Sequence, residues 1–153
     1  MKTFLPIRRL GMLLSSALLL MERPPASAQD LHVYKGTQVS PQVEKIYARG
    51  LQFLMASQNE DGSFPGNYGN EPAVAALSMM SMLAHGDDPN RGPFTKSIKR
   101  SLEFVFTQTN EKTGFIGGSM YNHGFCTLAL AEAYGGLQDE RIAPALKKAA
   151  CAP

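Results

Sequence analysis

The chain has 153 residues, of which 44% are hydrophobic and 18% charged, the composition of a folded protein rather than a disordered one. Its formal net charge of +2 comes from the N-terminus, because residues 1–28 hold four of the 15 basic residues and one of the 13 acidic ones. The 11 basic and 12 acidic residues that follow give a net charge of −1. This balance excludes a basic surface that would recruit nucleic acid.

Residues 1–28 have the order of a secretory signal peptide. A basic start at residues 2–9 precedes an apolar run at 10–21, and Ala26-Ser27-Ala28 forms a small-residue cleavage site. We therefore expect export to the periplasm or the extracellular space, with no stable membrane span after cleavage. The alternative is an uncleaved anchor, but the apolar run is shorter than the ~20 residues that a spanning helix needs. Residues 29–39 read as a polar lead-in.

The first helix is predicted to begin at Ser40-Pro41, a capping hydroxyl followed by proline at the first helical position. Its apolar residues recur at helical spacing on one side only, so it has one solvent-facing side. A loop rich in Gly, Asn and Pro follows at residues 59–71. The next helix, predicted for residues 72–85, is apolar almost all round and is therefore expected to be an inner helix.

The same alternation occurs a second time and then begins again. A one-sided helix is predicted for residues 94–108, a loop for 109–122, an apolar helix for 123–134, and a further one-sided helix from 139 to 150. Outer and inner helices that alternate in this way predict two layers. Because short connections make neighbouring helices antiparallel, the inner helices should run parallel to one another.

Two segments that start 51 residues apart resemble each other: RGLQFLMASQNEDGSF at residues 49–64 and RSLEFVFTQTNEKTGF at 100–115. A period of 20–50 residues is typical of stacked helical hairpins. The pattern resembles the QW repeat of squalene and hopene cyclases, with Phe64 and Phe115 at the position of the usual Trp. The broader group is the prenyltransferase and squalene oxidase repeat family, whose terpenoid-cyclase members form α/α toroids.

The resemblance covers residues 40–150 and implies an all-α, α/α-toroid segment from 40 to 153. The chain supplies about two and a half outer/inner helical hairpins, and a closed ring needs about six. We therefore expect an N-terminal fragment of a longer toroid. The alternative is a half-ring that covers its exposed inner helices by pairing with another copy.

The repeat residues have structural roles in this interpretation. The Gln58 amide is expected to bond helix-end carbonyls, Gly62 to allow a turn closed to other residues, and Phe64 to fill the space between hairpins. The full set of repeat residues is Gly50, Phe53, Gln58, Gly62, Phe64, Phe104, Gln108, Gly114 and Phe115.

The loops that lead into the two inner helices should meet at one rim, where helix N-termini favour anionic groups such as diphosphate. The candidate ligand-binding residues there are Tyr68, Asn70, Tyr121, Asn122 and His123, and the alternative is that they are turn, cap and filler residues.

Two residues are weak catalytic candidates. His123, at the expected start of an inner helix, can exchange a proton or bind a metal, or it can simply cap the helix. Glu132 is the one acid in an apolar helix, so it is a proton donor, a hydrogen-bonding group or an exposed end residue. The adjacent Asp87 and Asp88 read as turn residues, and no metal site and no cofactor are expected.

The favoured function is an exported, terpenoid-cyclase-like or prenyltransferase-like repeat protein that acts as a binding or structural scaffold without catalysis in this segment. Its expected partners are an apolar or isoprenoid-like ligand and a second copy that contacts the exposed inner helices. One alternative is a fragment of an isoprenoid cyclase or prenyltransferase whose catalytic motif lies elsewhere. The other is a secreted α/α-toroid polysaccharide lyase, which would carry exposed Lys, Arg and Tyr across a groove.

Overall fold

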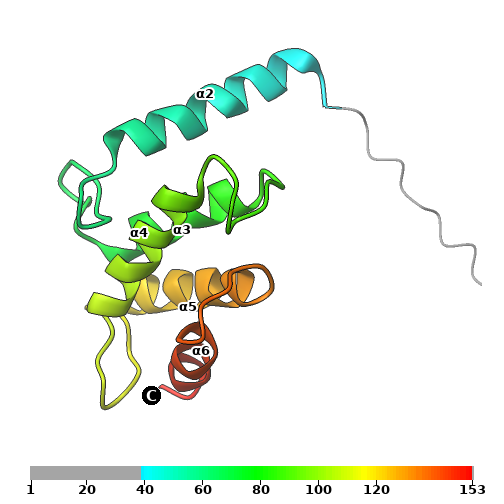
Figure 1. Cartoon of the computed structure of the whole chain (residues 1–153). Coiled ribbons are helices and arrows are strands. Elements are labelled where there is room, and N and C mark those ends of the chain that lie inside the picture. Colours follow the sequence, from blue (N-terminus) through cyan, green and yellow to red (C-terminus); the bar gives the residue numbers. More distant parts are fainter. Residues whose placement is uncertain (1–38, 153) are drawn as a thin grey trace, which may run out of the picture. The chain divides into compact units, whose positions relative to one another are not determined.

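The computed structural model describes residues 39–152, and this part of the chain contains five helices and no strand. The predicted signal peptide lies outside the described residues. The helices are α2 (Pro41–Ser57), α3 (Pro72–Leu83), α4 (Thr95–Thr107), α5 (Met120–Tyr134) and α6 (Ile142–Ala150), as labelled in Figure 1. The all-α prediction is therefore confirmed for the described part of the chain. No helix in it has the length and apolar character needed to cross a bilayer.

The helix ends follow local capping chemistry. Ser40 precedes α2, and its hydroxyl oxygen accepts a hydrogen bond from the backbone N–H of Val43 at 3.4 Å. α5 begins at Met120, three residues before the predicted start at His123. Ser119 causes this difference, because its side chain accepts from the N–H of Asn122 and so caps the helix earlier. His123 is therefore inside the first turns of α5 rather than at its cap.

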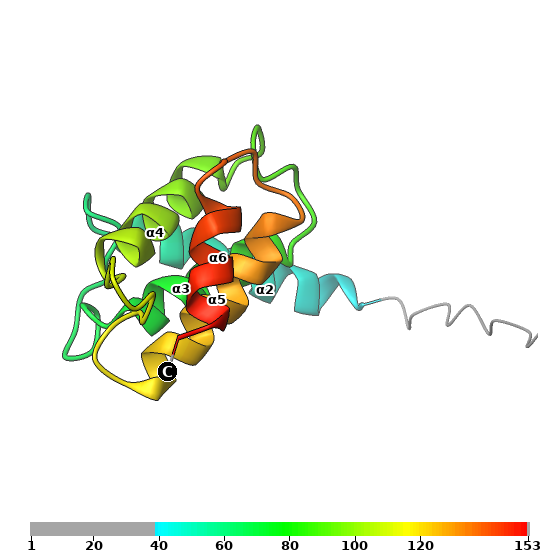
Figure 2. The same ribbon diagram turned by 90° about the horizontal axis from the view of Figure 1, so that it is seen from below.

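α3 lies at the centre of the packing. It packs most extensively against α5 and α4, and α6 packs on α5, as the two views of Figures 1 and 2 show. The sequence predicted hairpins of an outer helix with the inner helix that follows it. In the structure each apolar helix instead packs against the amphipathic helix that follows it: α3 against α4, and α5 against α6. α2 makes little contact with α3.

The main core lies between α3, α4, α5 and α6. The largest fully buried side chains that these four helices contribute are Met79, Met82, Ile98, Leu102, Leu130 and Ile142. Burying an aliphatic side chain of this size stabilises the fold by about 1.5–3 kcal/mol. α2 contributes only Leu51 to the fully buried set, so the 17-residue helix at the edge of the array is held by few contacts.

α3 and α5 run parallel. Hydrogen bonds link their N-terminal ends to each other, and other hydrogen bonds link the loops that follow their C-terminal ends. At one end, the side chain of Asn122 bonds the backbone of Ala73. At the other, the Asn90 side chain donates to the carbonyl of Gly136 at 2.8 Å and accepts from the N–H of Gln138 at 2.9 Å. The predicted parallel arrangement of these two helices is thus found.

Two glycine turns connect successive elements in the same way. In the first turn Gly62 has φ +91° and lies so close to α4 that an added Cβ would overlap the carbonyl of Arg100. In the second Gly114 has φ +78°, and an added Cβ would lie 2.6 Å from the carbonyl oxygen of Lys148 in α6. Each turn needs glycine for both its backbone conformation and its close approach to the next amphipathic helix.

The second turn is one residue longer than the first. Asn59 N–H bonds the carbonyl of Ser63, whereas Asn110 N–H bonds the carbonyl of Phe115. The residues after these closing bonds are Phe64, 5% exposed, and Ile116, fully buried. The predicted equivalence of Phe64 with Phe115 is therefore wrong, because the extra residue moves the buried position on to Ile116.

Candidate functional site: two clefts at the N-terminal ends of α3 and α5

Two adjoining clefts lie where α3 and α5 begin. The first has a volume of about 610 Å³ and is bounded by the starts of α3 and α5, the end of α4 and the glycine-containing loop before α5. The second, about 470 Å³, lies on the other side of the same helix starts. Glu71, Ser119 and Asn122 line both clefts and so form the wall between them.

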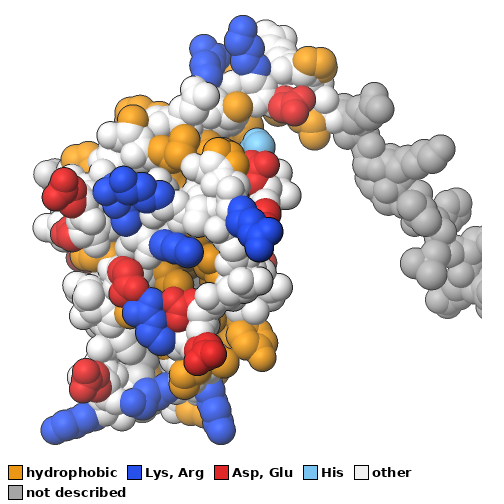
Figure 3. Space-filling model, in the orientation of Figure 1, with side chains coloured by type: hydrophobic (Ala, Val, Ile, Leu, Met, Phe, Trp, Pro, Cys, Tyr) orange, Lys and Arg blue, Asp and Glu red, His pale blue; other side chains and the backbone are white. Residues whose placement is uncertain are grey.

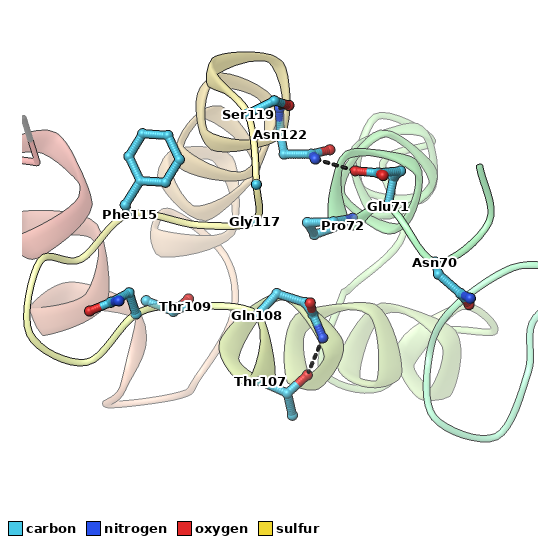
Figure 4. Close-up of a pocket in the computed structure, with 12 residues that line it drawn as sticks. Asn70, Glu71, Pro72, Thr107, Gln108, Thr109, Phe115, Gly117, Ser119 and Asn122 are labelled. Atoms are coloured by element: carbon cyan, nitrogen blue, oxygen red, sulfur yellow. Dashed lines mark hydrogen bonds between the residues drawn. The ribbon is translucent and has the colours of Figure 1, made fainter.

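Asn122 organises this wall. It is 2% exposed, its Nδ2 donates to the carboxylate of Glu71, and its Oδ1 accepts from the backbone N–H of Ala73 at 3.3 Å. Glu71 is the N-cap of α3 but makes no capping bond with its own side chain. Asn122 therefore satisfies one of the free N–H groups of α3, that of Ala73, from a neighbouring helix. Figure 4 shows its other hydrogen bond, to the carboxylate of Glu71.

The loop that closes the first cleft passes very near this wall. Gly117 has φ +72°, and an added Cβ would lie 2.8 Å from Cβ of Asn122 and 2.9 Å from Cγ of Pro72. Its N–H donates to the carbonyl of Gln108 at the end of α4. Glycine is thus required where the loop threads between α3 and α5, and the first cleft is held open between loop and helix ends (Figure 4).

The first cleft is polar but nearly uncharged. Amide and hydroxyl side chains such as Asn70, Gln108 and Thr109 line it together with the ring of Phe115, and Glu71 is its one ionisable lining residue. The Glu71 carboxylate already lies at the positive N-terminal end of α3. An anionic ligand would meet this carboxylate without any lysine, arginine or histidine among the described lining residues.

The second cleft carries two exposed aromatic side chains. Tyr68 is 76% and Tyr121 62% exposed, and they share the cleft with Val74. The ring of Tyr121 packs edge-on against Phe125 one turn along α5, with centroids 4.8 Å apart. Leu128, 46% exposed, continues this side of α5. An apolar surface therefore begins in the second cleft and extends along α5.

Of the predicted rim residues, the structure brings four to these clefts: Asn70 lines the first, Tyr68 and Tyr121 the second, and Asn122 both. Glu71 and Ser119 also line the clefts but were not among the predicted rim residues. Ser119 carried a readable signal as a capping hydroxyl before an apolar run. Glu71 carried none, because its partner Asn122 is 51 residues away in the chain.

The fifth predicted rim residue, His123, lies elsewhere. It is 8% exposed, its Nδ1 accepts a hydrogen bond from the backbone N–H of Ile116 at 3.2 Å, and its ring stacks on Phe115 with centroids 4.5 Å apart. Because the amide donates, Nδ1 carries no proton in this contact. His123 therefore fastens the second glycine turn to α5 and lines neither cleft.

The other chemical candidates are not near the clefts. Glu132 is exposed near the opposite end of α5, where it lines a separate hollow with Met80 and Pro89. Asp88 accepts from the N–H of Asn90, as its predicted role in the turn implies. Within residues 39–152, no three His, Cys, Asp or Glu side chains are close enough to hold a metal ion.

The repeat residues fall into two groups. Gln58 is 8% exposed, and its Nε2 donates to the carbonyls of Gly62 and Ser97 and to the hydroxyl of Ser101, so it ties the first turn to α4. The side chain of Gln108 is exposed, and its one hydrogen bond within residues 39–152 is a 3.5 Å contact to the hydroxyl of Thr107. Phe64 packs with Phe104. Gly50 and Phe53 lie on the exposed side of α2.

Comparisons of this chain with family models, curated proteins and solved structures found no match.

Proposed function

We propose that this protein is a non-catalytic helical-repeat scaffold of the α/α-toroid type that binds a ligand in the two clefts. The observation that carries the proposal is the repeated turn geometry: Gly62 against the carbonyl of Arg100, and Gly114 against that of Lys148. Two positive-φ glycines that approach equivalent places on successive amphipathic helices are what stacked repeats require. The resemblance of the two segments to QW repeats supports the same assignment.

The chemistry of the clefts supports a ligand with an apolar body and a neutral polar head. Tyr68, Val74 and Tyr121 offer an amphipathic surface for the body, and the amides and hydroxyls of the first cleft offer hydrogen bonds for the head. The negative charge of the Glu71 carboxylate would repel a diphosphate head group. An isoprenoid alcohol fits this description better than an isoprenoid diphosphate.

Isothermal titration calorimetry of the processed protein with farnesol and with farnesyl diphosphate tests this proposal. We expect farnesol to bind more tightly than the diphosphate, and Tyr68→Ala and Tyr121→Ala each to weaken binding about tenfold, or about 1.4 kcal/mol. Tyr134→Ala is the matched control, because Tyr134 is 61% exposed at the far end of α5. No heat of binding with either compound, or equal losses in all three variants, would refute the proposed clefts.

We further propose that the scaffold is exported and has no turnover of its own. Sequencing of the protein recovered outside the cytoplasm should begin at Gln29. Incubation of this protein with squalene or prenyl diphosphates should leave the substrates intact. Turnover that His123→Ala abolishes would instead favour the cyclase or prenyltransferase alternative. The lyase alternative calls for Lys, Arg and Tyr along one groove. The two clefts carry Tyr without Lys or Arg, whereas a separate hollow between α4 and α6 carries Arg141 and Lys148 without Tyr among its described lining residues.

A further inference from the structure

The edge helix α2 exposes a continuous apolar stripe. Val43 is 53%, Ile46 55% and Phe53 69% exposed, and Gly50, between the last two, has no atom within 4 Å of the place where a Cβ would stand. The spacing of these residues, three, four and three, puts them on one side of the helix. Figure 3 shows hydrophobic side chains along α2 at the top of the molecule, next to basic ones.

The same stripe exists on α4, where it is covered. The resemblance of the two segments aligns Arg49 with Arg100, and the four exposed residues then align with Phe94, Ser97, Ser101 and Phe104. Phe94, the N-cap of α4, is 8% exposed, and the other three residues are 7%, 0% and 7% exposed. The first glycine turn lies over these three: Gln58 bonds Ser97 and Ser101, and an added Cβ at Gly62 would lie 3.1 Å from that of Phe104. Phe94 instead packs edge-on against the ring of His85 and belongs to the main core.

α6 repeats this arrangement with the second turn. Lys148 is the residue against which Gly114 lies, so it corresponds to Arg100. Counting along α6, Ile142 and Ala149 then take the places of Phe94 and Ser101, and both are buried in the main core. The approach of Gly62 to Arg100 and of Gly114 to Lys148 thus places a glycine turn on two of the three amphipathic helices. α2 has the same surface without a turn among the described residues.

The residues whose carbonyls the two turns approach are basic, Arg100 and Lys148. The first turn carries Glu60 and Asp61 immediately before Gly62, whereas the second carries one charge of each sign, Glu111 and Lys112. In the second turn the carbonyl of Glu111 accepts from Nζ of Lys148. α2 has Arg49 at the equivalent place, together with Lys45, and neither forms a salt bridge within residues 39–152.

We propose that the stripe of α2 is a docking surface for a glycine turn of a further helical hairpin, contributed by another polypeptide. The turn would place a positive-φ glycine against the carbonyl of Arg49 and an apolar side chain beside Phe53. A second copy of this chain is not the occupant, because both of its turns already lie on its own α4 and α6.

The test uses a cysteine reporter, Ile46→Cys, in the full chain with the exposed Cys151 replaced by Ser. The docking turn is supplied by inserting an additional copy of residues 41–91 before Pro41. In this extended chain the copied glycine turn lies as far ahead of α2 in the sequence as the first glycine turn lies ahead of α4. We expect the reporter to react rapidly with a thiol reagent in the unextended chain. In the extended chain it should react at least tenfold more slowly.

The control is the same extension with Gly62→Val in the added copy, which should restore rapid labelling because the turn can no longer approach α2. Equal labelling with both extensions, or loss of the helical circular dichroism signal on extension, would overturn the proposal. Slow labelling of the unextended chain would also overturn the proposal. If the labelling is slow at every protein concentration, residues 1–38 of the same chain cover the stripe. If it slows only as the protein concentration rises, a second copy of the chain covers the stripe.

Discussion

Asn122 in α5 completes the N-terminus of α3 by accepting a hydrogen bond from the backbone N–H of Ala73 at 3.3 Å, while its other amide atom donates to Glu71. One buried side chain thus joins the two apolar helices and forms the wall between the two clefts. Asn122 therefore links the stability of the fold to the ligand binding that we propose.

Asn122→Ala should lower the free energy of unfolding by about 2–3 kcal/mol, because it leaves a buried N–H and a carboxylate without their partner. Urea unfolding followed by circular dichroism measures the change. Asn70→Ala is the control on the same rim; its side chain is exposed, so we expect less than about 0.5 kcal/mol. Equal effects of the two substitutions would show that the link between α3 and α5 is not formed.

Substitution of glycine should give opposite results at different positions. Gly62→Ala and Gly114→Ala should each destabilise the protein by more than about 2 kcal/mol, because both need positive φ and a Cβ would strike the backbone of the next helix. Gly50→Ala should stabilise it by about 0.5–1 kcal/mol, because this helical glycine has open space around it. Thermal unfolding of the three variants gives the comparison, and destabilisation by Gly50→Ala would contradict it.

The two repeat glutamines should differ in their contributions to stability. Gln58→Ala removes a buried amide that holds the first turn to α4 through three hydrogen bonds, so we expect a loss of about 2 kcal/mol. Gln108→Ala removes an exposed side chain and should cost less than about 0.5 kcal/mol. A large effect at Gln108 would mean that the second turn is fastened in a way that this structure does not contain.

The buried thiol of Cys126 gives a pH-dependent test of the core. Burial raises the pKa of Cys126 from 9.0 to about 12, because the thiolate would lie in the apolar core. The thiol ionises at a lower pH in the unfolded chain than in the folded protein. The contribution of the buried Cys126 thiol to stability is therefore present below pH 9 and is lost between about pH 9 and 12. We expect the midpoint of urea unfolding to fall less steeply with pH over this range in Cys126→Ala than in the wild type. Identical slopes would contradict the burial of the thiol.

The helices could be predicted from the sequence because their signals are local. Apolar residues at helical spacing and Ser40-Pro41 located α2 closely, and the two apolar segments located α3 and most of α5. The start of α5 was predicted three residues late, because Ser119, although it is a capping residue, directly follows two glycines that are typical of a loop.

The candidate site was predictable only in part, because its key contacts are distant in sequence. Two tyrosines could be placed at the rim because they lie just before or at the start of the apolar helices: Tyr68 precedes α3, and Tyr121 is in the first turn of α5. The pairing of Asn122 with Glu71, and the turn of the His123 ring toward Ile116, depend on how the loop before α5 passes between the helices. The one-residue difference between the turns likewise becomes visible only in their closing bonds.

The most direct test of the repeated turn geometry is a set of nuclear Overhauser effects in the labelled protein. We predict close contacts from the Hα atoms of Gly62 to the Cβ protons of Phe104, and from those of Gly114 to the side chain of Lys148. Observation of both sets, with similar intensities, would support two equivalent turns on successive helices. Absence of either set in an otherwise assigned spectrum would contradict the stacked-repeat account.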